Sequence, residues 1–129
     1  MAQLYLHDAI PFDPVRARRL IGEFLARPEW GGIWWIQSDG EFVGYFVLTV
    51  GYSLEFGGRF ALLDEFLIEE PWQGQGIGTR ALAFMEDWCR GQGIGALRLE
   101  VGHQNPRALA LYRRAGFLVL DRHFMTRLL

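Results

Sequence analysis

The clearest periodic pattern in the chain lies between residues 77 and 91. Apolar side chains recur there at Ile77, Ala81, Leu82, Met85, Trp88 and Cys89. This spacing places them on one face of an α-helix, and Gly91 and Gly93 end the pattern. The residues therefore predict a long amphipathic helix with one face against a core.

Two further helices are indicated by the residues at their ends. Asp13 can cap a helix, and a proline follows it at the first helical position. That helix has an apolar stripe and ends before Pro28. Asn105 is likewise followed by a proline, and Gly116 suits the left-handed backbone that ends a helix. The sequence thus predicts one helix near residue 20 and another between Asn105 and Gly116.

β-Branched and aromatic residues dominate the middle of the chain. Residues 33–37 and 42–52 have this composition and flank an Asp-Gly pair, which is a strong signal for a two-stranded hairpin. A second glycine-containing turn leads to a strand at residues 60–68. Together these segments predict a three-stranded antiparallel meander.

The end of the chain predicts a short strand at residues 96–101 and a final strand pair at 117–120 and 124–128. We find no repeat and no linker, so residues 1–129 are expected to form a single domain. Strands that precede and alternate with helices indicate an α/β or α+β fold. We expect a mixed, mostly antiparallel sheet flanked by helices.

Composition narrows the function classes. Half of the 129 residues are hydrophobic, and 13 basic side chains against 15 acidic ones give a net charge of −2. All the basic residues are arginines, and they are spread along the chain, so no nucleic-acid partner is expected. The absence of lysine excludes Schiff-base chemistry and a lysine phosphate loop.

The single cysteine, Cys89, excludes an internal disulfide and a cysteine-rich zinc site. The three histidines lack metal-ligand spacing, so no metal is expected. No apolar run reaches the roughly 20 residues that span a membrane. We expect a cytoplasmic protein without a membrane partner.

A glycine-rich turn at residues 72–78 lies between a predicted strand and the start of the long helix. Glycines let backbone N–H groups approach an anion, and the helix dipole adds positive charge at the same point. A phosphate site is the natural interpretation. Gly76-x-Gly78-x-x-Ala81 also matches a dinucleotide fingerprint, with Glu100 as its acid, although residues 69–74 separate the strand from the loop.

Two motifs, in order along the chain, resemble the acetyl-CoA-binding core of the GNAT superfamily of N-acetyltransferases. They are Gln73-x-x-Gly76-x-Gly78 and Asn105-Pro106-x-Ala108-x-x-Leu111-Tyr112-x-x-x-Gly116-Phe117. The resemblance covers about residues 32–128, and residues 52–59 look most similar to acetyltransferases of small amines and polyamines. It implies the GNAT fold and one N-acetyltransferase domain.

The resemblance implies that a strand edge and the glycine loop bind acetyl-CoA, with the strand pairing with its pantetheine arm and the loop with its pyrophosphate. The residues concerned are Phe66, Leu67, Ile68, Gln73, Gly74, Gln75, Gly76, Ile77, Gly78, Thr79, Arg80 and Asn105. Tyr112 is implied to be the general acid that protonates the departing thiolate. Asp64 and Glu65 are neighbours on a strand and face opposite sides, so at most one of them can serve directly as the base. The resemblance implies Asp64 as the preferred base and leaves Glu65 as the second choice.

The implied activity is direct transfer of an acetyl group from acetyl-CoA to a primary amine of a small molecule, in a ternary complex and without a metal. The alternatives are a non-catalytic CoA-binding regulatory module and, further off, a dinucleotide-binding fragment. Members of the family usually open with a strand and two helices, whereas about a dozen residues precede the first predicted helix here. We therefore expect the first strand-helix unit to be missing and a homodimer to cover the sheet edge.

Overall fold

The structure is a computed structural model of the chain, and it describes residues 13–129. The helices and strands are α2 (Pro14–Leu25), β1 (Gly31–Ser38), β2 (Glu41–Ser53), β3 (Gly58–Ile68), α3 (Ile77–Gly91), β4 (Leu97–Leu99) and α4 (Pro106–Arg114). Short 3-10 turns are η1 (Pro28–Trp30), η2 (Leu54–Phe56) and η3 (Glu70–Trp72). The expected absence of a first strand-helix unit concerns residues 1–12, which lie outside the described part.

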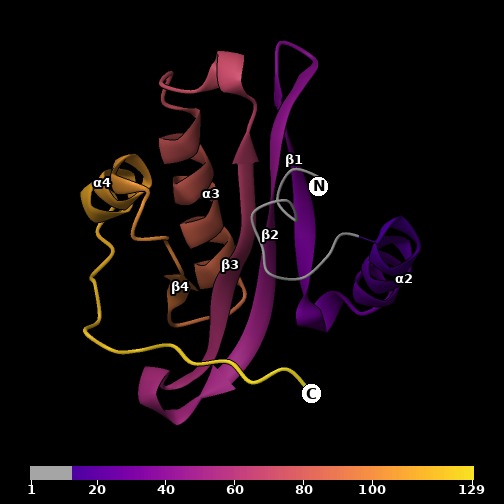
Figure 1. Ribbon diagram of the computed structural model, residues 1–129, viewed down its shortest axis with the longest axis vertical. Helices are drawn as coiled ribbons and strands as arrows, with labels where there is room; N and C mark the ends of the chain where they lie inside the picture. Colours follow the sequence, from indigo (N-terminus) through magenta and orange to yellow (C-terminus); the bar gives the residue numbers. More distant parts are fainter. Residues whose placement is uncertain (1–12) are drawn as a thin grey trace.

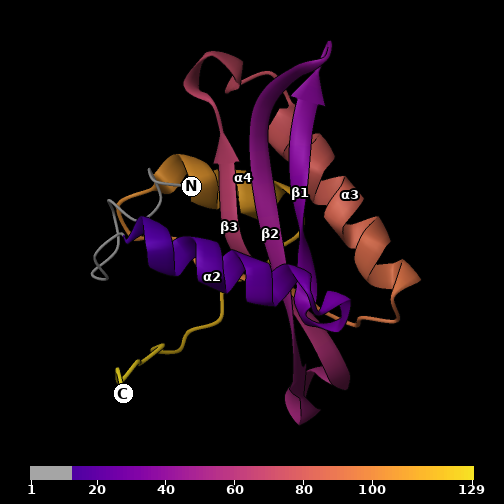
Figure 2. The same ribbon diagram turned by 90° about the vertical axis from the view of Figure 1, so that its right-hand side faces the viewer.

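The four strands form one sheet in the order β1-β2-β3-β4. β1, β2 and β3 pair antiparallel, and β4 pairs parallel to β3. Helix α2 crosses one face of the sheet, while α3 and α4 lie on the opposite face (Figures 1 and 2). This arrangement confirms the predicted mixed α/β fold with a mostly antiparallel sheet.

The predicted signals at the ends of elements are found in the structure. The carboxylate of Asp13 accepts a hydrogen bond from the N–H of Val15 (3.1 Å) and caps α2. In the β1–β2 turn, Asp39 and Gly40 both have positive φ angles, 52° and 81°, as a tight hairpin with the strands' twist requires. Gly116 has a φ of 98° just after α4. Local chemistry therefore sets where these elements start and stop.

The main core lies between the sheet and α3. Phe46, Leu48 and Leu63 from the strands are buried against Ala81, Leu82 and Met85 from the helix. Full burial of a side chain of this kind stabilises the fold by about 1.5–3 kcal/mol. The core thus fixes α3 on the sheet, and with it the loop that precedes the helix.

The prediction of a final strand pair is wrong. Residues 117–129 form no strand, and they run past the η2 end of the sheet (Figure 1). β4 has three residues instead of the predicted six, and all three pair with β3. Arg122 instead forms an ion pair with Glu55 in η2 (2.7 Å), and the hydrogen bond from Arg122 lowers the pKa of Glu55.

Candidate active site

The pairing between β3 and β4 ends halfway along β3. Their pairing ends with Leu63 and Leu99, whereas β3 continues to Ile68 with a partner only in β2. Within residues 13–129, the other edge of Phe66–Ile68 therefore faces no strand. Such an edge presents backbone N–H and C=O groups that an extended ligand with amide groups can pair with. This is the place where the sequence predicted the pantetheine arm.

The glycine loop follows β3 and η3. Gly74 and Gly76 have φ angles of 75° and 82°, a conformation that side chains disfavour. Two glutamine side chains brace the loop: Gln73 donates to the carbonyl of Ile68 (2.9 Å), and Gln75 donates to a carbonyl in η3 (3.0 Å). A Cβ at Gly76 would meet no atom within 4 Å, so the space beside this backbone is open.

The first turn of α3 is suited to an anion. Its N-cap is Gly76, and no side chain of the described residues caps the helix. The N–H groups of Ile77, Gly78 and Thr79 have no acceptor within the helix because they belong to its first turn. These donors and the positive end of the helix dipole point at the same space. The loop and helix start therefore fit the phosphate groups of coenzyme A.

Gly78 brings three elements together. A Cβ at this position would lie 3.2 Å from Leu111 in α4 and 3.5 Å from Ile68 in β3. An alanine here would require the side chain of Leu111 to shift by a few tenths of an ångström. Gly78 therefore holds the loop, the open edge of β3 and α4 in one place.

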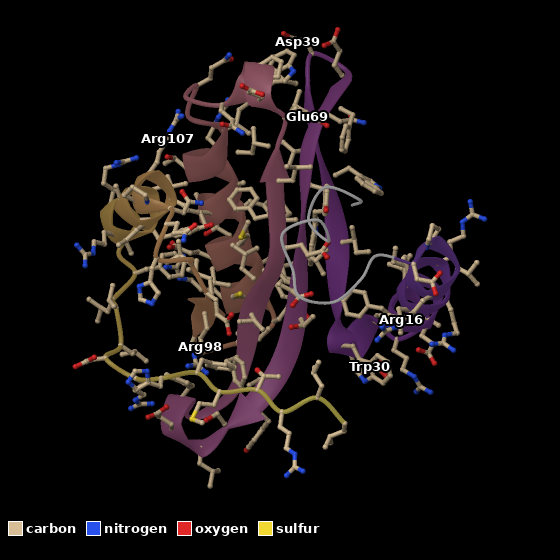
Figure 3. The ribbon with its side chains drawn as sticks, viewed as in Figure 1. Arg16, Trp30, Asp39, Glu69, Arg98 and Arg107 are labelled. Carbon is tan, nitrogen blue, oxygen red and sulfur yellow. The ribbon has the colours of Figure 1, made fainter. Side chains whose placement is uncertain are left out.

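Arg107 is a cation at the loop that the sequence did not reveal. Its guanidinium lies 3.2 Å from where a Cβ of Gly74 would stand, reaching from α4 (Figure 3). The predicted phosphate ligand Arg80 lines a cavity of about 290 Å³ together with Trp34 and Phe84, between β1 and α3. Arg107 occupies a variable position of the second motif, where its charge was the one signal available.

Helix α4 supplies the predicted acid and its cap. The side-chain carbonyl of Asn105 accepts a hydrogen bond from the N–H of Ala108 (3.1 Å), so Asn105 caps α4 as predicted. Tyr112 is half-buried and packs edge-on against Phe117, with ring centroids 5.7 Å apart. Burial raises the pKa of Tyr112. The phenol is therefore protonated at neutral pH, as a proton donor must be.

The two candidate bases lie at a bulge in β3. Val47 of β2 pairs with Glu65, and the next residue of β2 pairs with Leu63, so Asp64 is an extra residue in the ladder. Asp64 is exposed and Glu65 is half-buried. Tyr45 donates a hydrogen bond to the carboxylate of Glu65 (3.3 Å).

The strands β3 and β4 separate beside the glycine-rich start of α3, and α4 carries a tyrosine. Together these features define an α/β domain suited to a phosphate-bearing cofactor with an extended arm. The chain belongs to the acetyltransferase (GNAT) family, whose model matches residues 1–117. This membership confirms the resemblance, and η3 between β3 and the loop also separates the site from a dinucleotide turn.

A curated protein similar to this chain is also an N-acetyltransferase. The chain is 46% identical over 82 residues to the N-alpha-acetyltransferase RimI of Mycobacterium tuberculosis, covering 63% of this chain and 48% of that protein. It thus spans about half the length of the curated relatives it matches.

Two solved structures have the same fold. One is an integron cassette protein from the mobile metagenome of Cole Harbour Salt Marsh, 32% identical, with a TM-score of 0.85 over 100% of this chain and 80% of that one. The other is AAC(6')-Iy in complex with a CoA-containing bisubstrate analog, 16% identical, with a TM-score of 0.78 over 91% and 82% of the two chains.

The part of the chain that the structure describes contains no group of three or more histidine, cysteine, aspartate or glutamate side chains placed to hold a metal ion. None of its helices has the length and apolarity to cross a membrane.

Proposed function

We propose that this protein transfers an acetyl group from acetyl-CoA to a primary amine of a small molecule. The observation that carries the proposal is the edge of Phe66–Ile68, which no strand of residues 13–129 covers, followed through η3 and the glycine loop by the start of α3, which no side chain of these residues caps. An amide-containing arm and a pyrophosphate need these two features in this order. Family membership supports the same reaction.

The side chains at the site suit the proton transfers of a direct reaction. When bound, acetyl-CoA supplies an acetyl group on a good leaving thiol. An alkylamine of pKa about 10 is protonated at pH 7, and exposing its lone pair costs about 4 kcal/mol. We assign the acceptance of this proton to Asp64 or Glu65. We assign the donation of a proton to the departing sulfur to Tyr112, whose pKa is raised by burial.

The identity of the acceptor amine has one specific alternative. The similarity to RimI, an N-alpha-acetyltransferase by name, favours the N-terminal amine of a peptide or protein as the second candidate. A panel that contains a polyamine, an aminoglycoside and peptides with free N-termini separates the two classes. Release of free thiol with the small amines supports the proposal, and release with the peptides alone replaces it with the second candidate.

A non-catalytic CoA-binding module is the alternative outside enzymes. Coenzyme A would then raise the melting temperature without any acceptor releasing thiol. Saturation at 100 times the dissociation constant is worth about 2.7 kcal/mol of stability, which a melting curve detects easily. Stabilisation by NAD in place of coenzyme A would point to the dinucleotide alternative.

The homodimer and the cytoplasmic location belong to the same proposal. Large apolar side chains stand exposed in the C-terminal segment, including Leu118, Phe124 and Met125 at 86%, 75% and 88% exposure. Exposed apolar surface of this kind is typical of an interface. The single buried Cys89 suits a reducing compartment.

A further inference from the structure

We propose that Tyr45 is a positioning residue that holds Glu65 as the base of the reaction, in place of Asp64. The inference rests on the proposed function, because it names the group that takes the proton of the acceptor amine. It stands on the contacts of Tyr45, on the bulge in β3 and on the point where β3 leaves β4.

The hydroxyl of Tyr45 has a fixed position. Tyr45 lies in the central strand β2, and its side chain is 1% exposed. It pairs across the sheet with Trp35 on one side and Leu67 on the other. The rings of Trp35 and Tyr45 meet edge to face with centroids 5.9 Å apart. A side chain held on both sides in this way delivers its hydrogen bond to one place.

The hydrogen bond from Tyr45 favours the ionised form of Glu65. The phenol O–H donates to Oε2 of Glu65 over 3.3 Å in a part-buried setting. A carboxylate that accepts a hydrogen bond is stabilised relative to the carboxylic acid. Away from bulk water such a bond also fixes the direction of the carboxylate. The hydrogen bond thus orients the carboxylate of Glu65 before the acceptor arrives.

The bulge brings Glu65 to the opening in the sheet. The β4 ladder stops at Leu63, and Asp64 is the extra residue of the bulge. Glu65 is the next residue and the first to resume pairing with β2. It therefore lies where the open edge of β3 begins. Asp64 is exposed at the same point, whereas Glu65 is half-buried.

Aromatic rings extend from this carboxylate across β2 to β1. Trp35 is 62% exposed and also meets Phe42 edge to face at 5.6 Å. An exposed ring surface that leads to a carboxylate suits an alkylammonium ion, whose charge is attracted both by π faces and by the carboxylate. The aromatic rings and the carboxylate thus favour an acceptor that is a cation with an apolar portion.

The proton balance of the step is complete. The acceptor ammonium loses one proton to Glu65, which passes it to water. The amine nitrogen then forms its bond to the acetyl carbon, the carbon–sulfur bond breaks, and the nitrogen loses its second proton. The departing sulfur gains a proton from Tyr112, which is reprotonated by the proton that leaves the nitrogen.

The test compares Tyr45→Phe with Glu65→Gln, and Tyr52→Phe serves as a matched control because Tyr52 lies on the same strand but is 73% exposed. Protein labelled with ¹³C at the glutamate carboxyls is titrated by NMR, and the Glu65 signal is assigned as the one missing from Glu65→Gln. Loss of a hydrogen bond to the charged carboxylate is expected to raise the pKa of Glu65 by about one unit in Tyr45→Phe. Tyr52→Phe is expected to leave it unchanged.

Kinetics with the most active amine of the panel give the second readout. Glu65→Gln is expected to lower kcat by about 10²–10⁴-fold. Tyr45→Phe is expected to move the acid limb of the pH profile upward by the same unit as the NMR titration. Binding of coenzyme A, measured by calorimetry, is expected to persist in both variants and shows that they are folded.

Two results would overturn the inference. One is an unchanged Glu65 titration in Tyr45→Phe, and the other is wild-type turnover in Glu65→Gln together with a large loss in Asp64→Asn. Wild-type protein that releases no thiol with any acceptor counts against the proposed function instead. The NMR titration still decides the pairing of Tyr45 and Glu65 in that case.

Discussion

In the proposed reaction, Tyr112 donates the proton that the departing sulfur gains. Phenylalanine keeps the ring contact with Phe117 and removes the donor. We expect Tyr112→Phe to lower kcat by about 10²–10⁴-fold while binding of coenzyme A is retained. Burial raises the pKa of Tyr112 above the ordinary value of about 10 for a tyrosine. The wild-type phenol therefore stays mostly protonated up to that pH. The alkaline limb of kcat is therefore expected above pH 10, and an unchanged kcat in the variant would remove Tyr112 from the acid role.

Arg107 is the second residue whose effect can be isolated. Its guanidinium lies over Gly74, so Arg107→Ala is expected to weaken coenzyme A binding by about 3- to 10-fold. The loss is expected to shrink at high salt because the site is exposed. Calorimetry measures both. Arg113→Ala on the same helix is the control, and an equal loss in the two variants would contradict a specific contact.

The role that the sequence predicts for Arg80 can be tested against its position in the structure. The same calorimetry with Arg80→Ala decides whether this side chain reaches a phosphate from its place between β1 and α3. A motif gives the order of residues along the chain, but neighbouring positions on a helix point in different directions. The backbone donors of the loop follow from the motif, whereas the cation beside them depends on how α4 packs.

At the scale of elements, Gly78 lies where α3 approaches α4 and β3 closely. We expect Gly78→Ala to lower the free energy of unfolding by about 1 kcal/mol, since its Cβ would press on Leu111 at 3.2 Å. It should also weaken coenzyme A binding by moving α4 from the loop. Chemical denaturation with and without coenzyme A measures both effects.

The control is Gly91→Ala at the other end of α3, where a Cβ would meet nothing within 4 Å. Alanine is expected to stabilise the helix there by about 0.5–1 kcal/mol. A Gly78→Ala variant as stable as Gly91→Ala would mean that Leu111 yields freely and that the close approach carries no function.

The elements whose signals are local were predictable from the sequence, and those that depend on distant partners were not. Asp13 and Asn105 cap their helices with their own side chains, and the Asp39–Gly40 turn sets its own hairpin. The bulge at Asp64 arises from how β2 and β3 register over many residues. Residues 117–129 have strand-like composition but form no strand, so composition alone did not decide their structure.

At the scale of the whole molecule, the exposed apolar side chains of the C-terminal segment bear on assembly. A homodimer would bury Leu118 and Met125, which are 86% and 88% exposed in the single chain. Light scattering at micromolar concentration is expected to give twice the chain mass of 14.8 kDa. A mass of one chain would contradict the dimer.

The variant that locates the interface is the double substitution Leu118→Asp with Met125→Glu. Charges in a buried apolar contact are costly, so the double variant is expected to shift the mass toward one chain at the same concentration. Val15→Glu is the matched control, since Val15 is 79% exposed on α2, across the sheet from α3 and α4. If Val15→Glu dissociates the dimer and the double variant does not, the interface lies on the α2 side, next to the sheet edge that the sequence first suggested a partner would cover.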